Sequence, residues 1–460
     1  MKQFLDTSGP ATVVALNDHA YAVIKVDDEV QVVELCAPSV ESGEDENAQA
    51  QKKDTNPSAV LSVVSKWVED KKELLCAVSR YDKFISVYSI SVALDGDGAV
   101  AGTVDKVDPV VVHKTNKRCC ALTFTTIPYA DESKGSLNMI VGGDLAGDVN
   151  AFPVVSSSSG TQQRLLLGHT ASMITAVKVF DGKLFSADRD EKVRISLFPQ
   201  TYKVEGYLLG NDSYVTDMDV FETENGNKCC VTASGDCTIK MWDYEKCTEL
   251  SSLNVAPETN AESEEKDVEE MTSGEGSEGD AAAVDDDAVK QTTQIPVRVA
   301  ANGKGSIVAV IYNDKNAVEL FSVSSKGLEK MQSIECPNPL AITFDADDEL
   351  CVLMKEPQYM MRFIESANGK YSAFDECKIS SAVQKAGESA EISMPTSILE
   401  KDEKTGKLKL TKNIREEGNN YVEHTPWLNG DRVEKKKDKG RRHKESRRKR
   451  QKLEEEMGAN

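Results

Sequence analysis

The sequence has little of what metal sites and catalytic centres are built from. Its 460 residues include only five histidines, which share no motif: His19, His113, His169, His424 and His443. The eleven cysteines form no Cys-x-x-Cys pair and have no histidine at ligand spacing, so no zinc site is expected. No nucleophile with a neighbouring base and no Walker loop is visible. These absences give an enzymatic function little support.

Long apolar runs are also missing. No segment could span a bilayer, and the N-terminal MKQFLDTSGP lacks the apolar centre of a signal peptide. We therefore expect an intracellular chain with no membrane partner, in which thiols stay reduced. Most cysteines are expected to be small core residues of strands, as in CCVTASGD (229–236).

Charge is distributed very unevenly along the chain. The formal net charge is -22, and thirteen carboxylates lie between Glu258 and Asp287 beside the single Lys266. Such a run cannot bury a core, and we expect a disordered acidic insertion over about 256–290. Residues 432–452 hold thirteen Lys and Arg against three acids. The basic segment of a C-terminal tail is expected there.

The apolar pattern has no helical period before residue 380 and consists of short β-branched runs separated by turn residues. Three of these runs align on Val149, Val193 and Ile239, at offsets of 44 and 46 residues. A Gly-His pair at 168–169 precedes the second run, and Trp242-Asp243 ends the third. This spacing, with these dipeptides, is typical of WD repeats.

Four weaker copies of the strand-turn-strand unit bring the number of repeats to seven: AVIKVDDEVQVVEL, LLCAVSRYDKFISVYSIS, SIVAVIYNDKNAVELFSV and ELCVLMKEPQYMMRFIE. One blade cannot bury both of its faces, whereas a closed ring of blades leaves only short sheet edges. The prediction is an all-β, seven-bladed WD-repeat β-propeller over residues 10–366. The acidic insertion would lie between blades five and six, and residues 367–460 would form a tail that is mostly disordered apart from short helical stretches.

Several residues of the repeat pattern are expected to be structural. Asp236 would accept hydrogen bonds in the bend before a third strand, and Asp190 is placed as its equivalent one blade earlier. His169 would brace a blade, and Trp242 would lie in the core of its own blade.

One strand has more charge than a structural role requires. In SADRDEKVRIS (186–196), strand alternation places Lys192 and Arg194 on one face, with Val193 and Ile195 on the other. Exposed strand charges usually form only a solvated face. On a rigid propeller, however, such a mixed-charge patch suits a protein partner, because arginine can bind a carboxylate with two parallel hydrogen bonds.

Residues 167–216 resemble the non-catalytic WD-repeat subunit of tRNA (guanine-N7)-methyltransferase. The resemblance includes Leu-Gly-His at 167–169, Ala-Asp-Arg-Asp-Glu-Lys-Val-Arg at 187–194, and Pro-Gln-Thr-Tyr-Lys-Val-Glu-Gly-Tyr at 199–207. Similarity to the family extends over about 117–244. The chain departs from the family pattern at Asn211, where the next blade start has histidine, so that brace must be made differently or be lost.

The resemblance implies a binding function. A separate catalytic subunit would bind S-adenosylmethionine and methylate N7 of a guanine in the tRNA variable region, and this chain would hold no cofactor. The expected partner-binding residues, with Arg194 as first choice, are Arg194, Lys192, Glu191, Arg189 and Asp188. Lys117 and Arg118 are weaker candidates for contact with tRNA phosphates, because basic residues near blade ends usually only aid solubility.

Two alternatives differ in class from this prediction. The chain could be the methyltransferase itself, but its one Gly-x-Gly-x-x-Gly (274–279) lies in the acidic run without a strand before it or a helix after it. It could also be a nuclear WD-repeat scaffold of ribosome assembly or chromatin, because fold alone does not separate these functions. Whether the chain is the non-catalytic subunit or such a scaffold, the basic segment at 432–452 predicts a nuclear location.

Overall fold

The computed structural model describes most of the chain up to residue 410. The described residues are 3–16, 18–26, 29–36, 59–91, 106–128, 136–154, 163–170, 172–255, 294–355, 359–366, 368–374, 378–389, 399–401 and 408–410. The predicted acidic insertion and the basic segment at 432–452 lie outside them. The chain divides into two units, Met1–Leu399 and Glu400–Asn460, and the first unit contains nearly all of the described residues.

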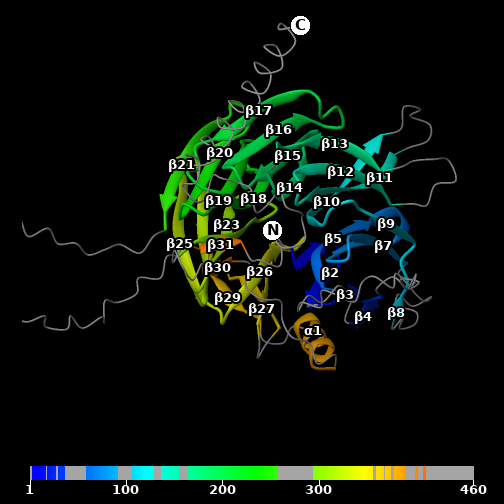
Figure 1. Ribbon diagram of the computed structural model, residues 1–460. Helices are drawn as coiled ribbons and strands as arrows, with labels where there is room; N and C mark the ends of the chain where they lie inside the picture. Colours follow the sequence, from blue (N-terminus) through cyan, green and yellow to red (C-terminus); the bar gives the residue numbers. More distant parts are fainter. Residues whose placement is uncertain are drawn as a thin grey trace, which may run out of the picture. The chain divides into compact units, whose positions relative to one another are not determined.

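Seven β-sheets of consecutive antiparallel strands form a ring in the described part of this unit (Figure 1). The innermost strands lie next to one another in the order β1, β5, β10, β14, β18, β22 and β26, and β26 contacts β1. The predicted all-β, seven-bladed propeller is therefore confirmed. Because every blade is built from neighbouring stretches of chain, the repeats found in the sequence correspond directly to blades.

Each blade is numbered by its place in the chain, and its strands are given from the inside outwards. Blade 1 consists of β1 (Leu5–Ser8), β2 (Ala11–Leu16), β3 (His19–Val26) and β4 (Glu29–Leu35). Blade 2 consists of β5 (Val60–Val68), β6 (Glu73–Arg80), β7 (Phe84–Ser91) and β9 (Val111–Lys114). Blade 3 consists of β10 (Cys119–Pro128), β11 (Ser136–Asp144), β12 (Asp148–Pro153) and β13 (Arg164–Gly168). The short β8 (Lys106–Val107) pairs in parallel with β4, and a 3-10 turn, η2 (Glu69–Lys71), joins β5 to β6.

The remaining blades follow the same plan. Blade 4 consists of β14 (Ile174–Phe180), β15 (Lys183–Asp188), β16 (Lys192–Leu197) and β17 (Val204–Leu209), and blade 5 of β18 (Val215–Glu222), β19 (Lys228–Ser234), β20 (Thr238–Asp243) and β21 (Thr248–Asn254). Blade 6 consists of β22 (Pro296–Ala301), β23 (Ile307–Tyr312), β24 (Ala317–Ser324) and β25 (Gly327–Glu335). Blade 7 consists of β26 (Pro339–Phe344), β27 (Leu350–Met354), β28 (Met360–Glu365) and β29 (Tyr371–Ala373). A separate two-stranded sheet contains β30 (Leu399–Lys401) and β31 (Leu408–Leu410).

The hydrophobic core is divided into clusters that lie between neighbouring blades. One cluster joins blades 4 and 5 through Val193, Ile195, Met218 and Trp242, and similar clusters fill the seams between blades 2 and 3, 3 and 4, and 5 and 6. A further cluster joins blades 7, 1 and 2. Eight of the ten cysteines in the described residues are buried, as expected, and burial raises the pKa of Cys229 to about 11. Each blade therefore depends on its two neighbours to remove its apolar faces from water.

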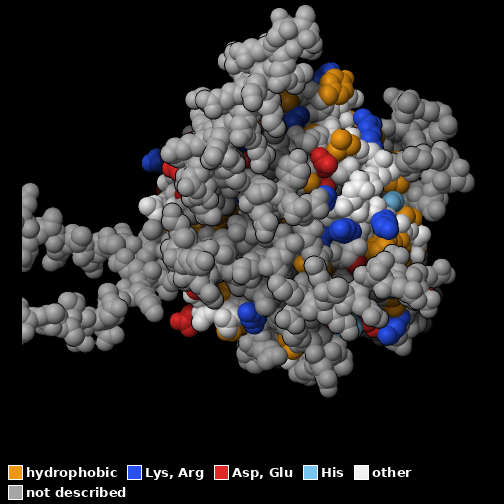
Figure 2. Space-filling model, viewed as in Figure 1, with side chains coloured by type: hydrophobic (Ala, Val, Ile, Leu, Met, Phe, Trp, Pro, Cys, Tyr) orange, Lys and Arg blue, Asp and Glu red, His pale blue; other side chains and the backbone are white. Residues whose placement is uncertain are grey.

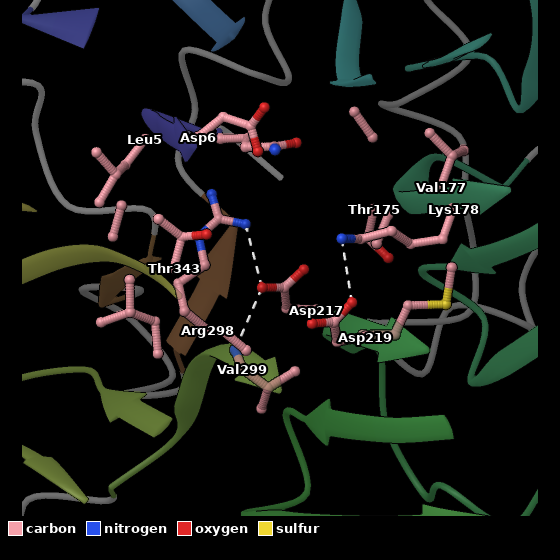
Figure 3. A pocket seen from close by; sticks show the side chains of 17 residues that line it. Leu5, Asp6, Thr175, Val177, Lys178, Asp217, Asp219, Arg298, Val299 and Thr343 are labelled. Atoms are coloured by element: carbon pink, nitrogen blue, oxygen red, sulfur yellow. Dashed lines mark hydrogen bonds and ion pairs between the residues drawn. The ribbon is translucent and has the colours of Figure 1, made fainter. Parts of the chain in front are cut away.

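Charged side chains of the inner strands line a cavity of about 70 Å³ inside the ring (Figure 3). Lys178 Nζ of blade 4 lies 3.0 Å from Asp219 Oδ1 of blade 5, and Arg298 Nη1 of blade 6 lies 3.6 Å from Asp217 Oδ2 of blade 5. The Val299 amide also donates to Asp217 Oδ2, at 3.3 Å. The carboxylate of Asp219 raises the pKa of Lys178. These contacts tie blades 4, 5 and 6 together at their inner edges.

The C-terminal limit of the ring differs from the sequence prediction. The pattern ended the propeller at residue 366, but β29 completes the last sheet, and the helix α1 (Lys378–Ser389) packs against β2, β3, β4 and β28. The boundary at residue 366 must therefore be corrected for β29, whereas α1 is a short helix in the region where the sequence predicts short helical stretches. Both elements are short and polar, so the sequence gives no apolar run that marks them.

Two turn glycines provide a test of how tightly the blades pack. Gly147 (φ +103°) and Gly182 (φ +67°) both have backbones that disfavour a side chain, but a Cβ at Gly147 would lie 2.6 Å from two carbonyl oxygens, those of His169 and Ser172. A Cβ at Gly182 would meet nothing within 4 Å. We expect Gly182→Ala to cost about 1 kcal/mol of unfolding free energy from backbone strain alone. Gly147→Ala should cost about 3 kcal/mol or more, because backbone must also move.

Chemical denaturation of the two variants and of the wild type measures this difference. Equal losses of unfolding free energy in the two variants would contradict the close packing of the turn between β11 and β12 against the carbonyl groups of His169 and Ser172.

Candidate partner interface

A buried carboxylate organises the turn between β15 and β16. Asp188 Oδ1 accepts hydrogen bonds from the backbone amides of Asp190 (2.8 Å) and Lys192 (3.2 Å). Asp188 Oδ2 accepts one from His169 Nδ1 at 2.8 Å, and the other ring nitrogen of His169 lies 2.8 Å from Ser186 Oγ. The Asp188 and His169 side chains are 1% and 5% exposed. Burial alone would raise the pKa of Asp188, but the bonds from His169 and the Lys192 amide outweigh it and lower that pKa.

This geometry corrects the role expected for Asp190. Its side chain is exposed, and in blade 4 the bracing carboxylate is Asp188, two residues earlier. In blade 5, by contrast, Asp236 Oδ1 accepts from the amide and hydroxyl of Thr238, at 2.9 and 2.6 Å. Because Asp188 is at the end of β15, its carboxylate lies inside the blade and contacts both the turn amides and His169. Asp190 lies in the turn itself, where its side chain is exposed.

The missing histidine of blade 5 is replaced by an amide. Thr232 Oγ1 donates to Asn211 Oδ1 at 3.3 Å and accepts from Trp242 Nε1 at 2.9 Å. Asn211 Nδ2 donates to the carbonyl of Glu191 at 3.5 Å, so it also contacts the turn of blade 4. The brace is therefore made differently, and Trp242, which is 1% exposed, is one of its buried donors.

Strand β16 presents its charges on one face, as strand alternation predicts. Val193 and Ile195 are 0% and 1% exposed and pack toward blade 5. On the opposite face, Arg194 Nε donates to Ser196 Oγ at 3.0 Å, and its Nη2 donates to the Thr201 carbonyl at 3.1 Å. These two bonds fix the guanidinium plane of the half-buried Arg194.

Apolar side chains share the face of β16 and β17 that carries Lys192 and Arg194. Arg194 is paired with Tyr207 and Lys192 with Leu209, and directly paired residues of antiparallel strands point to the same side. Tyr207 is 40% exposed and Leu209 is 64% exposed. We call Lys192, Arg194, Tyr207 and Leu209 the blade 4 patch. Figure 2 shows hydrophobic and basic side chains next to one another near the top of the view, where Figure 1 places β16 and β17.

Two further exposed apolar side chains lie on segments that hydrogen bonds of Thr201 link to Arg194. Tyr202, in the loop before β17, is 74% exposed, and Leu165 on β13 is 59% exposed. The Thr201 hydroxyl donates to the Leu166 carbonyl at 2.5 Å, which fixes this loop against blade 3. Sequence reasoning did not identify these apolar residues. The available signal was VEGYLL (204–209), an outer strand with more apolar residues than one buried face requires.

The other three predicted partner residues have different surroundings. Asp188 must be withdrawn as a partner contact, because its carboxylate is 1% exposed and fully used within the blade. Arg189 is 14% exposed, with Nε 3.9 Å from Asp190 Oδ1. Glu191 is exposed in the turn before β16, with φ at 77°. Of these three residues, Glu191 is therefore the acid that is exposed.

Of the two residues suggested for tRNA contact, Arg118 is buried. It is 3% exposed, its Nε donates to the Tyr81 carbonyl at 2.7 Å, and its guanidinium lies 3.2 Å from the centroid of the Tyr81 ring. Arg118 therefore joins blades 2 and 3 and cannot reach a phosphate without unfolding that seam. Lys117 is half-buried, and its carbonyl accepts from Thr115 Oγ1 at 2.6 Å.

Within the described residues, no group of three or more His, Cys, Asp or Glu side chains is arranged to hold a metal ion. Among the same residues, no helix has the length and apolar character needed to cross a membrane.

Comparison with known proteins supports the resemblance seen in the sequence. The family model described as tRNA methyltransferase TRM82 WD40 domain matches residues 156–357. The chain is 36% identical over 140 residues to the tRNA (guanine-N(7)-)-methyltransferase non-catalytic subunit WDR4 of Bos taurus, covering 30% of this chain and 31% of that protein. It is 27% identical over 216 residues to the non-catalytic subunit wuho of Aedes aegypti, covering 46% and 49%.

A third relative, the non-catalytic subunit wdr4 of Danio rerio, is 25% identical over 244 residues, which are 52% of this chain and 50% of the relative. The chain thus spans 31% to 50% of the length of these three relatives. The predicted resemblance to this family is confirmed for the region that is matched.

The turn that carries the patch should be sensitive to the charge of Asp188. Asp188→Asn should cost about 2 kcal/mol of unfolding free energy, because an amide NH₂ would face the donors that the carboxylate now satisfies. The pKa of Asp188 is lower in the folded protein than in the unfolded chain, where it is about 4, so ionised Asp188 stabilises the fold above that pH. This stabilisation is lost as pH falls through the pKa that Asp188 has in the folded protein. The difference between variant and wild type should therefore shrink below about pH 4.

Denaturation curves of both proteins across this pH range provide the measurement. Asp190→Asn is the matched control and should change stability by less than about 0.5 kcal/mol, because its side chain is exposed. A larger loss in the control than in Asp188→Asn would return the bracing role to Asp190.

Proposed function

We propose, from the TRM82 WD40 domain that residues 156–357 carry, that this chain is the non-catalytic subunit of a tRNA (guanine-N7)-methyltransferase. The relatives named above are described as non-catalytic subunits of that enzyme. In this proposal a separate catalytic subunit binds S-adenosylmethionine and transfers the methyl group to tRNA. The present chain contributes a binding surface.

The observation that supports a partner-binding role for this chain is the composition of the blade 4 patch. Its residues lie inside the matched region, on one face of two paired strands. Arginine and tyrosine are the residue types that most often dominate the energy of a protein interface. Ser196 and Thr201 hold Arg194 in a fixed orientation, so little side-chain entropy is lost when a partner binds.

The chemistry of the patch indicates what it would bind. Arg194 and Lys192 would bind a carboxylate on the catalytic subunit. Tyr207 and Leu209 would pack against an apolar side chain next to that carboxylate. Glu191 could pair with a basic residue at the edge of the contact. We also propose that Lys117 contacts tRNA in the assembled complex. The basic segment at 432–452 is the basis for proposing a nuclear location.

Charge reversal at Arg194 tests the partner. Arg194→Glu should weaken binding by roughly 2 to 5 kcal/mol, because it removes one half of a charge pair and opposes the other half. In a pull-down from nuclear extract, the wild type should recover a methyltransferase that forms N7-methylguanine on tRNA, and the variant should not. Lys326→Glu is the control, because Lys326 is an exposed cation in the turn between β24 and β25 of blade 6.

The folded state of each protein is verified by circular dichroism and melting temperature. A folded wild type that recovers no methyltransferase would favour a nuclear WD-repeat scaffold. Equal recovery by wild type and Arg194→Glu would mean that the partner binds elsewhere on the propeller.

Leu209 tests the apolar part of the patch separately. Leu209→Ala should weaken the complex by about 1 to 2 kcal/mol, through loss of apolar area buried on binding. It should leave the melting temperature of the free chain unchanged, because Leu209 is 64% exposed. Leu250→Ala is the matched control: the same substitution at a 41% exposed position on β21, the outer strand of blade 5.

Titration calorimetry with the purified catalytic subunit gives both dissociation constants. A loss of affinity in Leu250→Ala equal to that in Leu209→Ala would show that the contact is not centred on blade 4.

A further inference from the structure

The two ends of the propeller chain do not share a sheet among the described residues. Blade 1 contains β1 to β4 with β8, and blade 7 contains β26 to β29. No strand from the beginning of the chain completes the last blade in this part of the structure. The ring therefore has to be held closed between blades 7 and 1 by contacts other than a shared set of strand hydrogen bonds.

The seam between blades 1 and 2 shows how strongly neighbouring blades can be joined. The Val63 amide donates to the Gln3 carbonyl at 2.8 Å, and the Ser65 amide and hydroxyl donate to Asp6 at 2.6 and 2.8 Å. At the seam between blades 7 and 1, β1 lies beside β26, and Thr7 Oγ1 donates to the Phe344 carbonyl at 2.8 Å.

Helix α1 spans this last seam from the outside. It contacts β2, β3 and β4 of blade 1 and also β28 of blade 7. Ile379 and Val383, on one face of the helix, are 3% and 0% exposed and belong to a cluster that includes residues of blades 1, 2 and 7. On the blade 7 side, Gln384 Oε1 accepts a hydrogen bond from the Tyr359 amide at 3.1 Å. Figure 1 shows the helix beside β3 and β4.

The sequence of α1 gives little helix stability by itself. The helix has twelve residues, KISSAVQKAGES, with three serines and a glycine, no acid in its first turn and no base in its last turn. Isolated helices of this length are marginal even with good helix formers. The helix therefore depends on its buried face, and undocking would also unfold it.

We propose that α1 is a clasp that closes the ring by joining blade 7 to blade 1, and that the clasp opens by unfolding of the helix. In the docked state, Ile379 and Val383 hold the two end blades against each other. In the open state, both blades lose this cover while the seams of blades 3, 4 and 5 keep their own clusters. The closure of the propeller thus depends on a segment that lies after its last blade.

Hydrogen exchange of the full-length chain tests the clasp. Val383→Asp places a charge in the buried face, and Ser381→Asp adds the same charge at an exposed position of the same helix. We expect Val383→Asp to speed exchange at least tenfold in α1 and in peptides of both end blades, namely β2 to β4, β27 and β28. Peptides of β14 to β21 should keep wild-type rates, and Ser381→Asp should behave as the wild type.

Faster exchange in α1 alone, with blades 1 and 7 unchanged, would overturn the proposal, because the helix would then only rest on the ring. Faster exchange in every blade would also overturn it, because the effect would not be local to the seam. If Val383→Asp does not fold, the milder Ile379→Ala is measured with the same expected pattern. Binding through the blade 4 patch is a separate property, so failure of that proposal leaves this test unaffected.

Discussion

Burial of apolar faces between neighbouring blades is the constraint from which the other features of the structure follow. Val193 and Ile195 must face blade 5, because water would otherwise contact that side of β16. With a side-chain period of two, this leaves Lys192 and Arg194 no choice but the opposite face. The register with β17 then adds Tyr207 and Leu209 to that face. A surface suited to a partner is thus a consequence of how the core is packed.

Buried polar groups give this surface its rigidity. Asp188 holds the amides of the turn before β16, and His169 holds Asp188. Blade 5 meets the same requirement with Asn211, Thr232 and Trp242, although the histidine is absent. Such groups are costly to bury unless every donor finds an acceptor, so they specify one arrangement of the turn. The turn next to the proposed interface therefore has few alternative conformations, and this favours binding without reorganisation.

The sequence identified part of the candidate site and missed part. It located the charged strand and the faces of Lys192 and Arg194, because alternation within one strand is a local property. It could not identify Tyr207 and Leu209 as members of the same surface, because their place depends on the register between β16 and β17, with a bulge between Ile195 and Ser196. It also chose Asp190 over Asp188, because position in a repeat does not reveal which carboxylate points into the blade.

The sequence alone determined the repeat length, the alternation of strands, the number of blades and the similarity to a family, because each is set by residues close together in the chain. Tertiary structure decided which charged residues are accessible. Arg118 looks like a surface cation in the sequence, yet it is covered by Tyr81, 37 residues earlier. Helix α1 looks like part of a polar tail, yet blades 1 and 7 bury one of its faces. Burial is set by neighbours that are distant in the chain, and only the closed ring brings those neighbours together.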